Sequence, residues 1–260
     1  MLDYKNCNDK MNLITHFIAG YPSYESSLNT ALGLIDGGAF ALEMQIPYSD
    51  PSADGPVIES ACRESLKAGF RVKDAFNLLK EIGKHSNIKI YLMSYSGIVF
   101  NMGVQNFIKK AYDLGAAGII IPDLIPGADE GLYRLSRDID LSVVPVMVPG
   151  ISDDRLKEIL SEKPEWIYVA LRSGITGSYT RLDIDNLGFL QKLKVQGVKI
   201  MAGFGIQSPE QVYILMQHCD SAISGSFIVK ELEKAIKEGN PVRVAAADCV
   251  RFLTGNTAKQ

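Results

Sequence analysis

Residues 40–58, FALEMQIPYSDPSADGPVI, join a strand-like apolar run to a loop rich in carboxylates. In the run 40–46 two polar residues, Glu43 and Gln45, occupy alternate positions. Successive side chains of a strand point to opposite faces, so these two share one face and the apolar residues between them share the other. Because the apolar face must be buried, the pattern predicts a strand that is broken at Pro47 and whose apolar face is covered by helices. Its polar face is then directed to the interior of the fold.

Eight apolar runs of this kind recur along the chain, at residues 13–20, 40–46, 88–95, 117–124, 142–150, 166–174, 198–205 and 221–226. Segments with helical periodicity separate many of them, at residues 26–38, 72–85, 104–115, 153–163, 184–197 and 209–219. Regular alternation of strand and helix indicates a parallel sheet buried on both faces. The sequence therefore predicts one domain over residues 1–260, a (β/α)8 TIM barrel with an extended loop at 47–70 and extra N-terminal and C-terminal helices.

A doubly wound open sheet is the alternative fold. Its dinucleotide fingerprint, G-x-G-x-x-G, would follow the first strand. Residues 20–27 read GYPSYESS instead. No linker-like change of composition divides the chain, which again favours a single barrel.

Bulk composition narrows the function classes. The net charge is −3, 22% of residues are charged and 47% are hydrophobic, so there is no basic surface for nucleic acid and none for anionic lipid. We expect a cytoplasmic protein, since no signal peptide or membrane span is evident. The four cysteines and three histidines are dispersed, and no metal-ligand set is visible.

Glu43 is the first candidate catalytic residue. Active sites of such barrels form at the carboxyl ends of the strands, and alternation directs Glu43 into this mouth. A structural ion pair is the alternative, but no Lys or Arg falls on a nearby inward position. An unpaired carboxyl in such a place can carry a proton near neutrality, which is the behaviour of a general acid and base.

Two loop aspartates follow Glu43. Asp50 precedes a proline, and a turn-forming role is the stronger interpretation. Asp54 precedes Gly55 and a helical stretch, so a helix N-cap competes with a role in the site. The spacing alone leaves both roles of Asp54 open.

Glycine-rich turns follow the last three strands, at residues 174–177, 203–205 and 224–226. A glycine after a strand can serve only a tight turn. The last two turns, with a short helix expected from Ser226, match the place where such barrels bind a phosphate with backbone N–H groups. The residues thus predict a barrel enzyme that acts on a small phosphorylated compound by proton transfer.

The chain resembles the α subunit of tryptophan synthase. The resemblance rests on Glu43 followed by IPYSDP at 46–51 and ADGPVI at 53–58, supported in order by GYP (20–22), PDL (122–124), GITG (174–177), GFGI (203–206) and SGS (224–226). It implies cleavage of indole-3-glycerol phosphate to indole and glyceraldehyde 3-phosphate. It also implies an α-β-β-α heterotetramer in which the β subunit carries pyridoxal phosphate and this chain needs no cofactor.

The resemblance also implies residue roles. Glu43 would protonate indole C3 and help deprotonate the glycerol hydroxyl, and Asp54 would accept the indole N–H. Thr176 would close over the site and interact with Asp54. The candidate substrate- and phosphate-binding residues are Tyr95, Thr176, Gly177, Gly203, Phe204, Gly205, Gly225 and Ser226.

Four positions depart from the family pattern: Gln45 replaces a usual glycine, Gly97 an asparagine, Ile125 a proline and Leu171 a serine. We expect the Gln45 amide either to donate to Glu43, making it a poorer acid, or to fill part of the substrate volume. The isolated chain would then be slow. Two other functions stay open: another phosphosugar barrel enzyme, or a non-catalytic activator of a β subunit.

Overall fold

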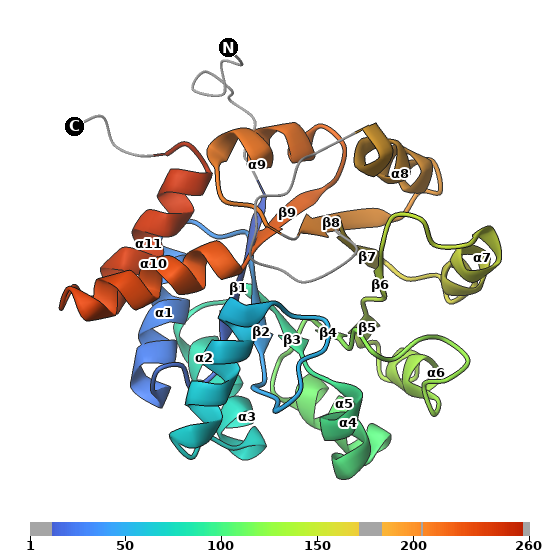
Figure 1. Ribbon diagram of the computed structural model, residues 1–260. Helices are drawn as coiled ribbons and strands as arrows, with labels where there is room; N and C mark the ends of the chain where they lie inside the picture. The colour runs from blue at the N-terminus through green and yellow to red at the C-terminus, as the bar shows by residue number, and fades with distance from the viewer. Residues whose placement is uncertain (1–11, 172–183, 204, 257–260) are drawn as a thin grey trace.

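A computed structural model describes residues 12–171, 184–203 and 205–256 of the chain. Within these ranges the strands form one parallel sheet that curls into a barrel, and the helices surround it (Figure 1). The strands are β1 (Leu13–Ile18), β2 (Ala41–Gln45), β3 (Lys89–Met93), β4 (Gly118–Ile120), β5 (Ser142–Val143), β6 (Val146–Met147), β7 (Trp166–Ala170), β8 (Lys199–Gly203) and β9 (Ser221–Ser224). The predicted TIM barrel is confirmed.

Two of the strands, β5 and β6, share one of the eight predicted runs. The sheet order is β5-β4-β3-β2-β1-β9-β8-β7-β6, so its two end strands are consecutive in the chain. Val144 donates to Ile119 on the β4 side at 2.9 Å, and the Pro145 carbonyl accepts from Tyr168 on the β7 side at 2.9 Å. The segment therefore bridges β4 and β7, and Pro145, which has no N–H, divides it.

The helices of the described ranges are α1 (Tyr24–Asp36), α2 (Pro56–Lys67), α3 (Val72–His85), α4 (Ser96–Met102), α5 (Val104–Asp113), α6 (Leu132–Arg137), α7 (Asp153–Ser161), α8 (Ile184–Lys194), α9 (Pro209–Met216), α10 (Ser226–Lys237) and α11 (Val242–Leu253). The extended loop after β2 holds α2, and α11 is the expected extra C-terminal helix. It lies against α1, where Arg243 pairs with Asp36 at 2.6 Å. The expected N-terminal helix falls on residues 1–11, outside the described ranges.

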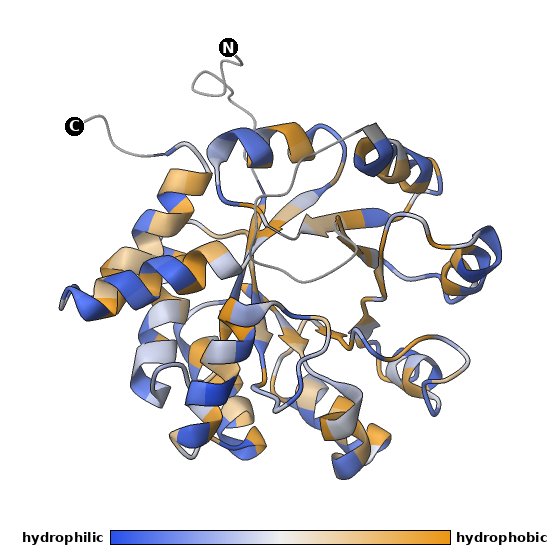
Figure 2. Ribbon diagram, viewed as in Figure 1, coloured by the Kyte–Doolittle hydropathy of each residue, from blue (hydrophilic) through white to orange (hydrophobic). Residues whose placement is uncertain are grey.

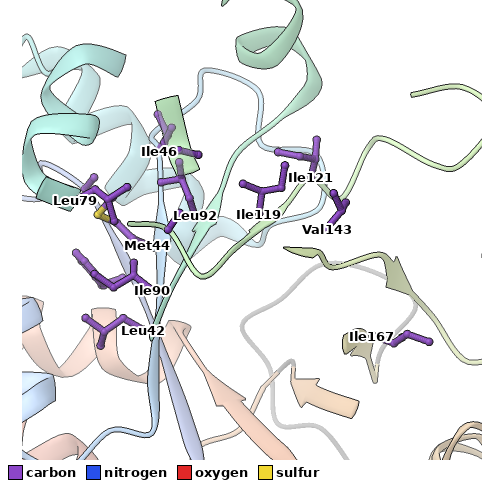
Figure 3. Packing of buried hydrophobic residues seen from close by; sticks show 14 of the residues in the cluster. Leu42, Met44, Ile46, Leu79, Ile90, Leu92, Ile119, Ile121, Val143 and Ile167 are labelled. Carbon is purple, nitrogen blue, oxygen red and sulfur yellow. The ribbon is translucent and has the colours of Figure 1, made fainter. Parts of the chain in front are cut away.

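Two apolar layers follow from the alternation along the strands. Leu42, Met44 and Ile46 lie between the sheet and its helices, in one cluster with Leu79 of α3, which lies beside Met44 (Figure 3). A separate cluster fills the barrel, including Ile14, Tyr91, Met93, Tyr168 and Ile223. The outward helix faces carry most of the hydrophilic residues (Figure 2). Glu43 therefore points into the barrel, as its alternation predicts.

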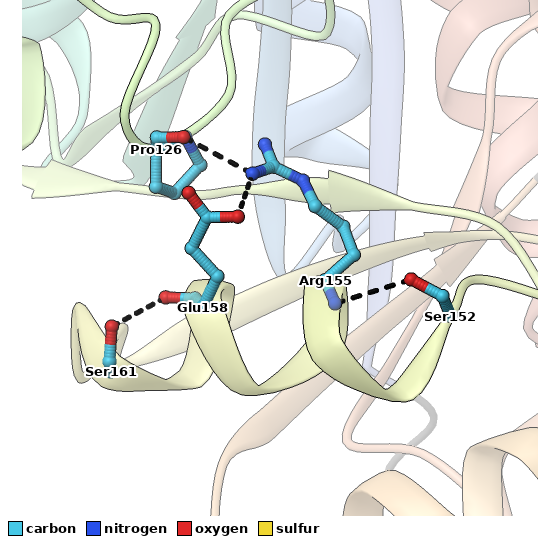
Figure 4. Close-up of polar contacts among 5 residues, drawn as sticks. All are labelled: Pro126, Ser152, Arg155, Glu158 and Ser161. Atoms are coloured by element: carbon cyan, nitrogen blue, oxygen red, sulfur yellow. Dashed lines mark hydrogen bonds and ion pairs between the residues drawn. The ribbon is translucent and has the colours of Figure 1, made fainter.

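Polar contacts fix the connections near the barrel mouth. Arg155 of α7 donates to the Pro126 carbonyl at 3.2 Å, and this bond ties α7 to the loop after β4 (Figure 4). Arg155 also pairs with Glu158 of the same helix. Asp123, after β4, accepts from the Ser96 backbone N–H at 2.9 Å and so binds the start of α4. None of the described helices combines the length and the apolar character needed to cross a bilayer.

Candidate active site

A cavity opens at the carboxyl ends of the strands. It is lined by His16, Glu43, Ala53, Asp54, Ile58, Met93, Ile120, Pro122, Val146, Tyr168, Gly205, Ile223, Gly225 and Ser226. Both candidate acids are in this lining, and so are three residues of the candidate phosphate turns. Side chains from distant parts of the sequence thus meet in one place.

Glu43 is 2% exposed and lies beside His16. The two residues are register partners on β2 and β1, and Nδ1 of His16 is 3.3 Å from Oε1 of Glu43. The expectation that Glu43 is unpaired is therefore wrong: only Lys and Arg were weighed as partners, and the imidazole fills that place. The other oxygen, Oε2, has no hydrogen-bond partner among the described residues and is free to meet a ligand.

His16 is buried in an acidic environment. Burial lowers the pKa of His16, but the charge and hydrogen bond of Glu43, together with the other groups around the ring, raise it, and the net pKa lies above the ordinary value of 6.5. The charge of Asp54 acts in the same direction. The imidazole therefore retains a proton at a higher pH than an exposed histidine would.

Asp54 does not cap α2. The N-cap residue of that helix is Gly55. The Asp54 carboxylate instead accepts hydrogen bonds from Tyr95 Oη and Gln45 Nε2, each at 2.8 Å and both to Oδ2. No donor from the described part of the chain reaches Oδ1, so this oxygen is available to accept from a ligand.

The electrostatics of Asp54 are balanced between opposing effects. Burial raises its pKa, and the positive charge of His16 opposes that rise. The hydrogen bonds from Tyr95 and Gln45 also favour the ionised form. The net pKa of Asp54 lies above its ordinary value of 3.8, so protonation of Asp54 begins at a higher pH than for an exposed aspartate.

Gln45 has a different partner from the one expected. Its side chain is fully buried and faces inward, but its Nε2 donates to Asp54, and more weakly to Cys62 Sγ at 3.5 Å. The predicted hydrogen bond to Glu43 is therefore wrong. The loop after β2 folds back over the strand and brings the Asp54 carboxylate within reach of the amide.

Tyr95, a candidate substrate-binding residue, lies behind Asp54. It is fully buried, and its hydroxyl also accepts from the Ala53 backbone N–H at 3.2 Å. Its ring stacks on Tyr48 with centroids 5.3 Å apart. Tyr95 therefore holds the loop that carries Asp54, and it is not among the residues that line the cavity.

The candidate phosphate turns lie on the side of the cavity near β9. Gly205 has φ of +76°, which favours glycine. Gly225 is the N-cap of α10, which begins at Ser226, has 12 residues and is longer than predicted. The N–H groups of this first turn have no intrahelical acceptors, as at every helix start. Gly203 ends β8 and lies outside the cavity lining.

Three further candidates, Phe204, Thr176 and Gly177, lie outside the described residues. Among the residues that are described, no group of three or more His, Cys, Asp or Glu side chains is arranged to bind a metal ion. The chemistry available in the described site is therefore that of two carboxylates, one imidazole, the hydroxyls of Tyr168 and Ser226, and backbone N–H groups.

Sequence reasoning missed His16 and Tyr168. The signal for His16 was present: it is a polar residue inside the apolar run 13–20, two positions from inward-facing Ile14, and the alternation rule that selected Glu43 selects it too. Tyr168 is one of several aromatic residues on its strand, and only the fold places it at the cavity.

Comparison with known proteins identifies the family. The sequence profile described as tryptophan synthase alpha chain matches residues 2–254. This chain belongs to the tryptophan synthase alpha chain family. Among the relatives, the tryptophan synthase alpha chain of Helicobacter hepaticus is 40% identical over 228 residues, 85% of each chain. That of Alkaliphilus metalliredigens is 32% identical over 235 residues, 90% of this chain and 88% of the relative.

Solved structures agree with the family assignment. The α subunit in the tryptophan synthase α2β2 complex of Pyrococcus furiosus superposes with a TM-score of 0.86 at 31% identity, over 95% of this chain and 98% of the other. A tryptophan synthase alpha chain fold thus extends over nearly the whole length.

Proposed function

We propose that this chain cleaves indole-3-glycerol phosphate to indole and glyceraldehyde 3-phosphate. The observation that carries the proposal is the presence of two carboxylates with different surroundings in one cavity, Glu43 beside an imidazole and Asp54 beside two neutral donors. Family membership supports the same reaction.

Glu43 transfers protons in this mechanism. It gives a proton to C3 of the indole ring and then takes one from the glycerol hydroxyl next to the bond that breaks. The electrons of the broken carbon–carbon bond return to the indole ring, and an aldehyde forms from the alkoxide. Glu43 ends the cycle protonated, as it began, and His16 lies close enough to exchange that proton with it.

Asp54 stabilises the intermediate charge. Protonation at C3 makes the indole nitrogen cationic, and a carboxylate oxygen that accepts the N–H stabilises this state more than the neutral ring. Oδ1 of Asp54 is suited to the task, because Tyr95 and Gln45 both bind Oδ2.

The phosphate of the substrate would lie at Gly205, Gly225 and Ser226. Backbone N–H groups at the first turn of α10 offer donors and the positive end of the helix dipole. The glycines leave the backbone open to close approach.

A partner completes the proposed function. The related Pyrococcus furiosus protein is solved as an α2β2 complex, and we propose that this chain likewise binds a β subunit, to which it passes indole. Pyridoxal phosphate would belong to that partner, and this chain would need no cofactor. A cytoplasmic location stays a prediction.

An assay of glyceraldehyde 3-phosphate and indole release tests the proposal, with the isolated chain and then with a β subunit added. Glu43→Gln is expected to lower the rate by about 10² or more, the usual contribution of a general acid and base. Asp54→Asn is expected to lower it too, whereas Asp50→Asn is the matched control because Asp50 is exposed on the same loop.

Release of neither product with or without the β subunit would overturn the proposal. Activation of the β subunit without any cleavage would instead identify a non-catalytic activator. Conversion of the substrate without carbon–carbon cleavage would point to another phosphosugar enzyme.

A further inference from the structure

His16 lies between the catalytic carboxyl and the phosphate turn. It is 6% exposed and lines the cavity. Its Nδ1 atom is 3.3 Å from Glu43 Oε1. A Cβ atom built on Gly225 would lie 3.1 Å from His16 Cδ2. The same added atom would lie 3.0 Å from His16 Cβ and 3.1 Å from Cγ, so the stem and the Cδ2 side of the imidazole lie against Gly225, whereas Nδ1 lies beside Glu43.

The second ring nitrogen makes no hydrogen bond of normal length to the described residues, although the Gln45 side chain lies close enough to favour the protonated ring. His16 Nε2 is buried and has no hydrogen-bond partner among the described residues. It is bonded to Cδ2, on the edge near Gly225. A buried polar atom without a partner is costly, and a ligand oxygen in the cavity could satisfy it.

The protonation state of His16 affects the charge balance of the cavity. Glu43 faces it from β2 and Asp54 from the following loop, while the hydroxyl of Tyr168 comes from β7. The pKa of Tyr168 is raised well above 10, chiefly by burial, so this group stays neutral. Among the described residues that line the cavity, His16 is the one basic side chain. Among these described lining residues, a phosphate dianion entering the cavity therefore meets two carboxylates and one compensating imidazole.

We propose that His16 couples the binding of an organic phosphate at Gly225 and Ser226 to the protonation of the His16–Glu43 pair, which takes up a proton as the ligand binds. The inference rests on the phosphate site of the proposed function. His16 is a positioning residue here, because it acts on the reaction through Glu43.

The coupling follows from elementary electrostatics. A dianion close to the Gly225 edge of the ring stabilises the imidazolium and draws a proton from solvent. The pair then holds one proton between Nδ1 and Oε1, available for transfer by Glu43 to carbon. Since Glu43 recovers a proton from the substrate hydroxyl, the pair keeps its proton through the cycle. The phosphate of the substrate thus promotes protonation of the residue pair that supplies the proton for cleavage of the substrate.

Titration calorimetry with glycerol 3-phosphate at pH 8 tests the proposal. At this pH the ligand is mainly a dianion, because its second pKa is about 6. Measurements in two buffers with different ionisation enthalpies give the number of protons taken up. We expect uptake of roughly 0.3 proton or more per ligand for the unmodified chain, by linkage between binding and protonation.

Two variants identify the group that takes up the proton. His16→Gln is expected to abolish the uptake and to weaken binding several-fold. His85→Gln should preserve both, because His85 is an exposed histidine on α3 that pairs with Glu81 away from the cavity. The ¹⁵N resonances of the His16 ring, followed in the unmodified chain, should move toward the imidazolium position as ligand is added.

The outcomes separate this inference from the proposed function. If glycerol 3-phosphate does not bind the unmodified chain, the phosphate site itself is wrong. If it binds without proton uptake and without movement of the His16 resonances, the site stands and the coupling is overturned. Equal uptake in a folded His16→Gln variant would also overturn it. Should that variant fail to fold, the histidine resonances of the unmodified chain decide.

Discussion

Gln45 Nε2 donates a 2.8 Å hydrogen bond to Oδ2 of Asp54 and so joins the end of β2 to the loop that follows it. Tyr95 Oη donates to the same oxygen at 2.8 Å. Two neutral donors thus favour the ionised form of Asp54 against the burial that raises its pKa. Replacing either donor should change the pH dependence of catalysis.

Gln45→Leu tests the first donor. Asp54 must be ionised to accept the indole N–H, so the rate rises with pH as Asp54 loses its proton. Loss of a donor to the carboxylate raises the pKa of Asp54 further, and the acid limb of the pH–rate profile is expected to move to higher pH. The profile of kcat against pH measures this shift.

Asp54→Asn supplies the control for Gln45→Leu. With no carboxylate to titrate at this position, Gln45→Leu should not move the acid limb of the Asp54→Asn chain. A limb that stays in place in both backgrounds would show that Asp54 does not control it. The expectation that the Gln45 amide donates to Glu43 and makes it a poorer acid no longer has a basis, because the amide donates to Asp54.

Tyr95→Phe tests the second donor through stability. The substitution removes the bond to Asp54 and the acceptor of the Ala53 N–H in a fully buried site. The free energy of unfolding should fall by about 1–3 kcal/mol, the usual cost of leaving buried polar groups unpaired. Urea unfolding measures it. Tyr48→Phe is the matched control: its ring stacks on Tyr95, and it should cost less than Tyr95→Phe. Equal losses would contradict the role given to the Tyr95 hydroxyl.

Gly225→Ala tests the phosphate turn. A Cβ atom here would lie 3.0 Å from His16 Cβ and beside the proposed phosphate position. Affinity for glycerol 3-phosphate should fall about tenfold, equivalent to about 1.4 kcal/mol. Gly83→Ala in α3 is the control, because no described atom lies within 4 Å of its added Cβ, and alanine favours the helix. Unchanged affinity in folded Gly225→Ala would place the phosphate elsewhere.

The barrel could be predicted from the sequence because the patterns that indicate its strands and helices are local. The eight apolar runs, the inward face of Glu43 and the helix start at Ser226 all follow from alternation, periodicity and glycine placement. The six-residue helix α6 was not predicted, since LYRLSR is too short to show a period. The division of one run into β5 and β6 depends on the strands beside Pro145 in the folded sheet, which the local sequence pattern does not indicate.

The contacts within the site were harder to predict than their positions. The partner of Gln45 depends on how the loop from Pro47 to Gly55 folds back, and no periodic pattern encodes that path. The sequence alone is equally consistent with Asp54 as the N-cap of α2. His16 is different: it obeyed the same rule as Glu43, and its pairing could have been predicted by including histidine among the cations.

Gly97 and Tyr48 form a coupled pair next to the site. Gly97 is the second residue of α4, and a Cβ built there would lie only 2.4 Å from Tyr48 Oη and 3.1 Å from Cζ. Any side chain at position 97 must therefore displace the Tyr48 ring, which stacks on Tyr95. Gly97→Ala should destabilise the chain, although alanine in an exposed helix would stabilise it by up to about 1 kcal/mol.

A double-mutant cycle measures this coupling. Tyr48→Phe removes the closest atom, so Gly97→Ala should cost less in that background, with an interaction free energy of about 0.5 kcal/mol or more. The displaced stack should also disturb Tyr95 and, through it, Asp54. Gly97→Ala is therefore expected to lower kcat, and Tyr48→Phe to restore part of it. Additive free energies of unfolding, together with an unchanged kcat, would show that the two positions are independent and that Tyr48 does not support the Asp54 loop.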